Sequence, residues 1–449
     1  MTPAERKRAA LLSGPIWPPL VRMAVPTTIA MLISMMMSVV ETWYLGRIGT
    51  VELAGVALVF PIYMLTMMLA AGSVGGAASG ATANAVGAGD QARAEMILRA
   101  SIRIAVVAGL LMGLLFWLVG PAFYGLLGGE GAVLEAALSY SNILMAGLVL
   151  MWLFNMISGI LRGAGDMVTP ALLQALVSLS HLGFCWLYII HFDMGIEGAA
   201  FAMISAFGVG TAGLLMIFLT GRGPIAYRAG PVSRALLMPL LKLGSLAGIQ
   251  AVMTILTTLL VTGLVGQLGA AWLAGYGVSA RLEFLMIPII FGVGAALIAI
   301  AGANRGAGQQ ARAASIAWRG TAATTCLVGI IGLLNAAFPE AWASQFTDDP
   351  EVIAASAVYM RQVAPFYAFF ALGLTLYFAS QAMQTLGVPV FGSLLRLLVI
   401  AGGGALLWSI DAATPQNLFI AVAAGMCAYG VVVALGLRFI SWRPVLQPA

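Results

Sequence analysis

The octapeptide GAGDQARA at residues 87–94 returns, with one residue changed, as GAGQQARA at residues 306–313. Each copy is a short polar segment between long apolar stretches, and the copies lie almost half a chain apart. A second pair, GRIGTVELAG at 46–55 and GQLGAAWLAG at 266–275, aligns with nearly the same offset. The repeat predicts that residues of about 20–220 and 240–440 are two copies of one structural unit.

The composition around the octapeptides is typical of an integral membrane protein. Hydrophobic residues make up 61% of the 449 residues and charged residues only 8%, whereas soluble domains carry about 25% charged residues. Stretches such as AVVAGLLMGLLFWLVG (105–120) have no polar face, which excludes a large soluble core. They are also longer than the roughly ten alternating residues of a barrel strand. We therefore expect an all-α polytopic membrane protein.

Polar or Gly/Pro-rich breaks divide the chain into twelve apolar segments, six in each copy of the repeat. The expected spans are 18–44, 53–84, 97–119, 133–160, 168–192, 196–220, 237–264, 272–303, 314–338, 355–384, 388–411 and 415–440. The expected organisation is an N-terminal tail (1–17), an N-lobe (18–220), a linker (221–236), a C-lobe (237–441) and a C-terminal tail (442–449). Because an even number of spans separates the copies, the lobes are expected to be parallel repeats with a substrate path between them.

Basic residues gather in the loops on one side of this arrangement. They are Arg6, Lys7, Arg8, Arg93, Arg99, Arg103, Arg222, Arg228, Arg234, Lys242, Arg305, Arg312, Arg319, Arg438 and Arg443. The positive-inside rule makes that side the cytoplasm, so both termini are expected to be cytoplasmic and the protein to lie in the inner (plasma) membrane. The charge is spread over short loops and does not form one soluble face, so we expect no nucleic-acid partner.

The octapeptides then become the loops after spans two and eight. The GAG in each is typical of a helix C-cap and turn, and we prefer this interpretation to substrate contact. The sequence has no GKS or GKT phosphate-binding motif, so ATP hydrolysis is not expected.

Several motifs in order carry a family resemblance. VVETWYLGRIG (39–49), GAGDQARA, GILRGAGDMVTP (159–170), GQLGAAWLAG and NRGAGQQARA (304–313) resemble the multidrug and toxic compound extrusion (MATE) family, over nearly the whole chain. The resemblance implies a V-shaped fold of twelve helices in two lobes. It also implies a secondary active antiporter, not an enzyme, that exports amphipathic, often cationic, small molecules by alternating access in exchange for protons or sodium ions. The expected partners are a small organic substrate, protons and membrane lipid, with no cofactor and no metal, and we expect a monomer.

Glu41 is the first candidate for cation coupling. An ionisable side chain inside an apolar span costs a few kcal/mol unless it has a cavity, a partner or a proton. Members of the family carry an acidic residue, usually aspartate, at this position of span one, and the sequence VVETWYLG keeps the acid. The alternative is a solvated, inert carboxylate near the membrane exit. Pro26, earlier in the same span, frees a backbone carbonyl and can kink the helix, a bend that the resemblance also implies.

Span five bears on the choice of ion. Family members often show an N-x-x-x-D pattern there, whereas this chain has HLGFC, with His181 and Cys185 at the matching positions. Neither side chain is a hard oxygen ligand, so sodium would lose two expected donors. A histidine beside a carboxylate suits a proton relay, and the hypothesis is therefore proton coupling through Glu41 and His181. A histidine that only hydrogen-bonds a backbone carbonyl is the alternative.

The second lobe offers Arg281 and Glu283 in span eight and Gln250 in span seven. Arg281 and Glu283 are two residues apart, so they point to different sides of a helix and each should meet another element. A structural interhelix ion pair and a role in coupling or binding are both open. Other family members carry a glutamate in span seven and an aspartate in span ten, and this chain has neither at those places.

An adaptable substrate path would use methionine and aromatic side chains, for which Met37, Tyr63, Phe284 and Tyr367 are the candidates. Packing or lipid contact is the alternative role for such residues. A lipid-linked oligosaccharide or lipid flippase of the same superfamily is the second functional hypothesis, and it requires a basic cavity for a pyrophosphate headgroup. A membrane enzyme would need clustered catalytic groups, and a channel would need a repeated pore-lining motif. The sequence shows neither of them.

Overall fold

The computed structural model describes residues 11–440. The basic residues Arg6, Lys7, Arg8 and Arg443, and the whole predicted tail 442–449, lie outside the described residues. Within residues 11–440 the regular structure is entirely helical. Eleven of these described helices are long and apolar enough to cross a membrane, or twelve spans if one bent pair counts as a single span. The predicted all-α fold with twelve membrane spans is therefore confirmed.

The first lobe contains the helices up to residue 219. They are α2 (Trp17–Ile48), α3 (Thr50–Met67), the π-helical η1 (Met68–Val74), α4 (Gly75–Ala88), α5 (Gln91–Leu126), α6 (Gly131–Ala146), α7 (Leu148–Gly163), α8 (Val168–Cys185), the π-helical η2 (Trp186–His191) and α9 (Gly195–Leu219). The segments α3, η1 and α4 form one continuous span.

The second lobe begins after the linker. It contains α10 (Arg234–Gly266), α11 (Ala270–Gly306), α12 (Gln310–Ala337), the short α13 (Pro339–Ala343), α14 (Pro350–Val363), the 3-10 turn η3 (Ala364–Phe366), α15 (Tyr367–Met383), α16 (Gly387–Ser409) and α17 (Pro415–Ile440). The segments from α14 to α15 again form one span.

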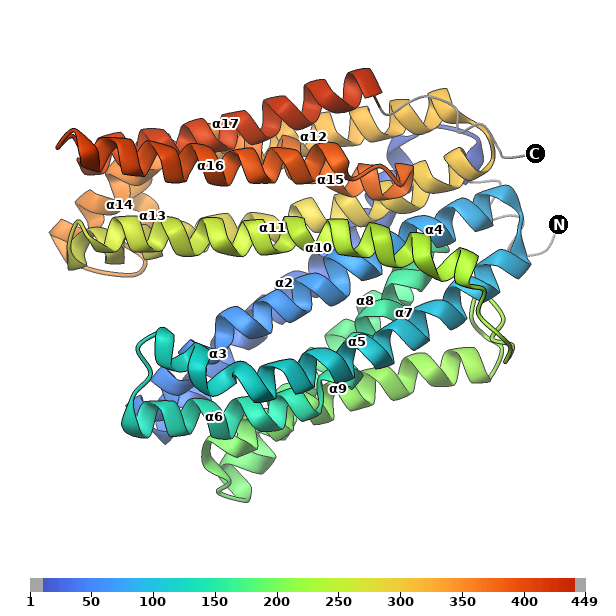
Figure 1. Ribbon diagram of the computed structural model, residues 1–449, viewed down its shortest axis with the longest axis horizontal. Coiled ribbons are helices and arrows are strands. Elements are labelled where there is room, and N and C mark those ends of the chain that lie inside the picture. The colour runs from blue at the N-terminus through green and yellow to red at the C-terminus, as the bar shows by residue number, and fades with distance from the viewer. Residues whose placement is uncertain (1–10, 441–449) are drawn as a thin grey trace.

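The two lobes form a V. Most of the buried apolar residues of each lobe form a core of their own, and a smaller cluster joins the start of α2 to α11 and α12. In Figure 1 the lobes meet at the end that carries the α4–α5 and α11–α12 loops, and their helices diverge toward the opposite end. The octapeptides therefore lie where the lobes join.

Each octapeptide begins at a helix end, as the sequence predicted. Gly89 follows α4 with φ +77° and Gly308 follows α11 with φ +78°, the left-handed conformation that glycine adopts without strain. After Gly89 the Asp90 side chain accepts a hydrogen bond from the Arg93 backbone N–H at 2.9 Å and so caps α5. The second glycine of each GAG is thus a left-handed residue just after the end of the helix.

The first glycine of each GAG has a different role, which the sequence alone did not reveal. A Cβ atom placed on Gly87 would collide with the Ala303 carbonyl oxygen in the other lobe, and one on Gly306 would collide with the Asn84 carbonyl oxygen. The last turns of α4 and α11 therefore pack backbone to backbone. The repeated glycine is required by contact between the lobes as well as by the turn.

Hydrogen bonds between the lobes lie in the same half of the molecule. The Asn84 side-chain amide donates to the Ala382 carbonyl at 2.9 Å. The Gly72 carbonyl, within the π-helical η1, accepts from Gln381 Nε2 at 2.7 Å and from the Tyr377 hydroxyl at 3.1 Å. A π-helical turn displaces backbone carbonyls from the ordinary helical pattern, and here the Gly72 carbonyl accepts hydrogen bonds from the C-lobe.

Two features of the spans differ from a row of regular helices. The fourth span is bent by 51° between α6 and α7, where Gly147 packs against the side chain of Ile204. Pro26 lies inside α2, and the helix continues through it. The bend expected at Pro26 stays a prediction.

Candidate coupling sites in the two lobes

Glu41 and His181 come together between α2 and α8. Both are buried, with 8% and 5% of their surfaces exposed. His181 Nε2 lies 3.7 Å from Glu41 Oε1 and 3.3 Å from the Cys185 sulfur, one turn further along α8. The two candidates chosen separately from spans one and five therefore share one site.

One carboxylate oxygen of Glu41 lacks a hydrogen bond. Oε1 is buried and has no hydrogen-bond partner among the described residues, since His181 Nε2 is too distant for one. Tyr140 on α6 lies within hydrogen-bonding reach of the same carboxylate, and Tyr63 on α3 is an electrostatic neighbour of it. An unpartnered buried oxygen costs about 1–3 kcal/mol, and more when it is charged, so a proton that neutralises the carboxylate would lower this cost.

A row of polar side chains continues from this site along the α2–α8 contact. The Ser34 and Ser178 hydroxyls are 2.9 Å apart, and Gln174 Nε2 donates to the Ser34 hydroxyl at 3.1 Å. Ser178 lies one turn from His181 on α8, and Ser34 lies about two turns from Glu41 on α2. The polar row thus leads from the Glu41 site toward the end where the lobes join.

A second carboxylate site lies inside the C-lobe. The Tyr359 hydroxyl on α14 donates to Glu283 Oε1 at 2.5 Å, and Tyr367 on α15 lies beside the same carboxylate. The Glu283 carboxylate also has a basic neighbour, Arg396 on α16, and a polar neighbour, Tyr276 on α11. Unlike Glu41 Oε1, Glu283 Oε1 has a short, direct hydrogen-bond donor.

Arg281 does not join this site. Its guanidinium lies over the ring of Phe346, 5.0 Å from the ring centre, in the loop between α13 and α14. The residue is exposed. Arg281 and Glu283 thus contact different elements, as their spacing on the helix predicted.

The internal repeat relates the two sites. Gly55 packs against Ala136 in the N-lobe, and Gly275 packs against Ala355 in the C-lobe. The offset that relates Ala136 to Ala355 makes Tyr140 equivalent to Tyr359. In the second span of each copy, the offset that relates Gly55 to Gly275 makes Tyr63 equivalent to Glu283. Each lobe therefore holds a carboxylate beside an equivalent tyrosine, but the acid comes from the first span in one lobe and from the second span of the repeat in the other. Applying the repeat offset to the tyrosines would have revealed this pairing from the sequence.

The remaining predicted residues do not gather in one place. Gln250 is buried and donates to the Tyr429 hydroxyl at 3.4 Å, inside the C-lobe. Tyr63 and Tyr367 lie beside the two carboxylates, and Tyr367 is fully buried. Phe284 exposes 47% of its surface, and Met37 is partly exposed. The role of Met37 and Phe284 as substrate contacts stays a prediction.

Comparison with known proteins agrees with this architecture. The family model MatE matches residues 26–187 and 247–402, one segment in each lobe. The chain belongs to the MatE family. This family consists of membrane transporters, not enzymes, that carry small organic substrates.

Individual members of the MatE family extend the comparison. The chain is 24% identical to a probable multidrug resistance protein NorM of Thermotoga maritima, over 80% of this chain and 78% of the relative. It is 24% identical to an FAD transporter of Shewanella oneidensis, over 89% and 90%. Among solved structures, a MOP superfamily transporter from Pyrococcus furiosus superposes with a TM-score of 0.89 at 20% identity, covering 96% of this chain and 97% of that chain. The last likeness concerns the fold.

Proposed function

We propose that this MatE protein exports amphipathic, cationic small molecules in exchange for protons, and that Glu41 carries the proton. The observation that carries the proposal is the buried Glu41 Oε1, which has no hydrogen-bond donor among the described residues and faces His181 Nε2 at 3.7 Å. A proton on the carboxyl would neutralise this unpartnered oxygen, and a proton on the imidazole would place a positive charge 3.7 Å from it. Gain and loss of that proton would change the charge of a buried site between α2 and α8.

The chemistry of the ligands around Glu41 favours a proton over sodium. Sodium, like other hard cations, prefers several oxygen ligands, whereas the nearest side chains on α8 present an imidazole nitrogen and a thiol. Imidazole exchanges protons near neutral pH. The row Ser178, Ser34 and Gln174 would extend the site toward the joined end of the lobes through hydroxyl and amide groups, which can donate and accept.

The proposed orientation determines which side of the membrane the open end of the V faces. If the octapeptide loops are cytoplasmic, as the positive-inside rule predicts, the lobes are closed on the cytoplasmic side and splayed on the outer side. Rocking the lobes would then open the cytoplasmic side, as in other parallel-repeat transporters. Substrate would leave from the outward-facing form while Glu41 takes up a proton.

The test is transport by purified protein in proteoliposomes, with proton and sodium gradients imposed separately. We expect a proton gradient to drive movement of a fluorescent organic cation, and a sodium gradient at fixed pH to drive none. A ligand that binds the native state raises its thermal stability. We therefore expect that sodium, if it does not bind, leaves the thermal stability of the purified protein unchanged. Sodium-driven transport without a proton gradient would contradict proton coupling. His181→Ala with wild-type transport would leave Glu41 as the sole carrier.

A further inference from the structure

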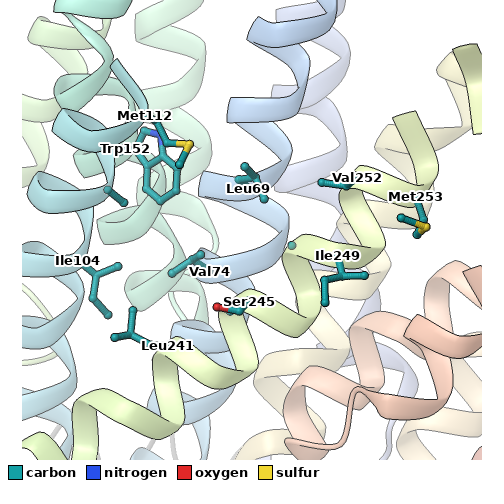
Figure 2. A pocket seen from close by; sticks show the side chains of 13 residues that line it. Leu69, Val74, Ile104, Met112, Trp152, Leu241, Ser245, Ile249, Val252 and Met253 are labelled. Carbon is teal, nitrogen blue, oxygen red and sulfur yellow. The ribbon is translucent and has the colours of Figure 1, made fainter. Parts of the chain in front are cut away.

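A large apolar cavity lies in the seam between the lobes. It has a volume of about 380 Å³ and is bounded by α5, η1 and α7 of the N-lobe and by α10 of the C-lobe. Figure 2 shows Ile104 and Leu241 at one end of the cavity and Val252 and Met253 at the other, with Ser245 between them on α10. Apart from Ser245 and the indole of Trp152, the labelled side chains are aliphatic or thioether groups.

The cavity is open to its surroundings. Ile249 and Leu241 line it, yet they expose 45% and 37% of their surfaces. α5 and α10 both lie at the front of the molecule in Figure 1. Both helices are long and apolar enough to cross a membrane, so we infer that lipid surrounds this opening.

Glycines bring α10 close to the N-lobe at the floor of the cavity. Gly244 would place a Cβ 3.1 Å from the Val74 side chain, and Gly248 would place one 3.1 Å from the Leu69 side chain. The cavity therefore lies beside a close contact between α10 of the C-lobe and η1 of the N-lobe. Any occupant contacts both lobes.

The length of the cavity matches one leaflet. Its lining residues on α10 run from Leu241 to Met253, which is about 18 Å along a helix. One leaflet takes about half of the ~30 Å hydrocarbon core. A single acyl chain from the leaflet next to the octapeptide loops has the length and the apolar character that the cavity requires.

Two basic residues are sequence neighbours of lining residues at the octapeptide end of the cavity. Lys242 follows the lining residue Leu241 and is exposed, and Arg103 precedes the lining residue Ile104 and is exposed. Arg103 donates to the Gly230 carbonyl at 2.9 Å through Nη2 and has further N–H donors. The nearby acid Glu95 lies 3.9 Å from Arg228, which offsets its charge. The rim therefore carries a net positive charge, which complements an anionic headgroup.

We propose that this cavity is a binding site for an anionic phospholipid, with one acyl chain between the lobes and its headgroup at Lys242 and Arg103. The lipid would contact both α5 and α10 and would therefore favour the conformation in which the cavity exists. This inference does not depend on the ion or on the substrate that is transported.

The test measures lipid binding, not transport. Purified protein is reconstituted in phosphatidylcholine vesicles that contain either phosphatidylglycerol or phosphatidylcholine with brominated acyl chains, which quench tryptophan fluorescence on contact. We expect stronger quenching by the brominated phosphatidylglycerol at equal content. The excess should disappear in Trp152→Phe, because the indole of Trp152 lines the cavity.

Two variants and one control separate a site from general attraction. Lys242→Gln should weaken preferential phosphatidylglycerol binding about fivefold, the effect of one basic residue at a membrane surface. Ala108→Phe, which fills the cavity from α5, should abolish the excess quenching if the protein remains monodisperse. Arg319→Gln on α12 removes an exposed basic residue away from the cavity and should change nothing.

Three results would overturn the proposal. One is equal quenching by the two brominated lipids. Another is the same loss of binding in Arg319→Gln as in Lys242→Gln, which would indicate a diffuse surface charge. The third is displacement of the brominated phosphatidylglycerol by a fluorescent organic cation, which would assign the cavity to substrate entry.

Discussion

At the scale of single residues, the Glu41 and Glu283 carboxylates differ in what surrounds them. Glu41 Oε1 has no hydrogen-bond donor among the described residues and faces His181, whereas Glu283 Oε1 accepts a 2.5 Å hydrogen bond from Tyr359. Glu41 Oε1 therefore lacks a hydrogen-bond donor, whereas Glu283 Oε1 has one. This difference leads to opposite expectations for the two residues.

Replacing Glu41 should uncouple transport. Glu41→Gln removes the titratable group but keeps its shape and most hydrogen bonds, so we expect normal expression and no proton-driven efflux. Glu41→Asp keeps the acid and should retain part of the activity. The exposed Glu130→Gln serves as the matched control and should transport as wild type. Normal proton-driven transport by Glu41→Gln would remove Glu41 from the mechanism, and equal loss in both Glu41 variants would argue for strict geometry over protonation.

Replacing Glu283 should affect stability more than coupling. Its hydrogen bond joins α11 to α14, and Tyr359→Phe would leave a partly buried carboxylate oxygen without that donor, at a cost of about 1–3 kcal/mol. We therefore expect Glu283→Gln to keep proton-driven transport, and Tyr359→Phe to lower the thermal unfolding temperature. Transport is measured in proteoliposomes and stability by thermal unfolding in detergent. A Glu283→Gln protein of wild-type stability that no longer responds to the proton gradient would instead assign coupling to this lobe.

At the scale of helices, the closed side of the molecule depends on the last turns of α4 and α11. Gly87 and Gly306 allow these turns to pack backbone to backbone across the lobes. The adjacent hydrogen bonds, from Asn84 to the Ala382 carbonyl and from Gln381 to the Gly72 carbonyl, join the same surfaces. Each net hydrogen bond adds about 1 kcal/mol. The contact is thus tight but can be exchanged for another arrangement.

An added methyl group at either glycine should open this side. Overpacking costs about 1–3 kcal/mol, so Gly87→Ala and Gly306→Ala should each shift the equilibrium toward the form open at the octapeptide end by about fivefold or more. Distances between spin labels on α5 and α12, in a protein without its native cysteines, would measure the shift. Gly277→Ala, on the same helix as Gly306 and with open space around it, is the control. Unchanged distance distributions in both variants, relative to Gly277→Ala, would contradict the role of this contact.

At the scale of the whole molecule, the sequence predicted the parts of the fold that rest on hydropathy and repetition. The segment 415–440 begins and ends with α17, because Pro415 starts the helix after a polar loop. The segment 133–160 forms two helices bent by 51° at Gly147, whose backbone packs against Ile204 in a different span. A contact between distant segments leaves no periodic signal in the local sequence.

In the candidate site too, the sequence indicated single unusual residues, but not the contacts between residues on different helices. Glu41 and His181 stand out because ionisable residues are costly in apolar spans, and the structure brings them together. Tyr140 was not recognised, because a tyrosine in an apolar segment is ordinary and only its contact with Glu41 distinguishes it. Tyr367 was predicted as a substrate contact, and the structure buries it beside Glu283. Pairing across helices is a property of the fold and not of any one segment.

The central claim is that substrate and proton compete through Glu41. The most direct measurement is the number of protons released when a fluorescent organic cation binds to the purified protein, obtained by calorimetry in buffers of different ionisation enthalpy. We predict proton release by the wild-type protein and none by Glu41→Gln, even where that variant still binds the cation. Equal proton release by the two proteins, or none by the wild type, would contradict the claim.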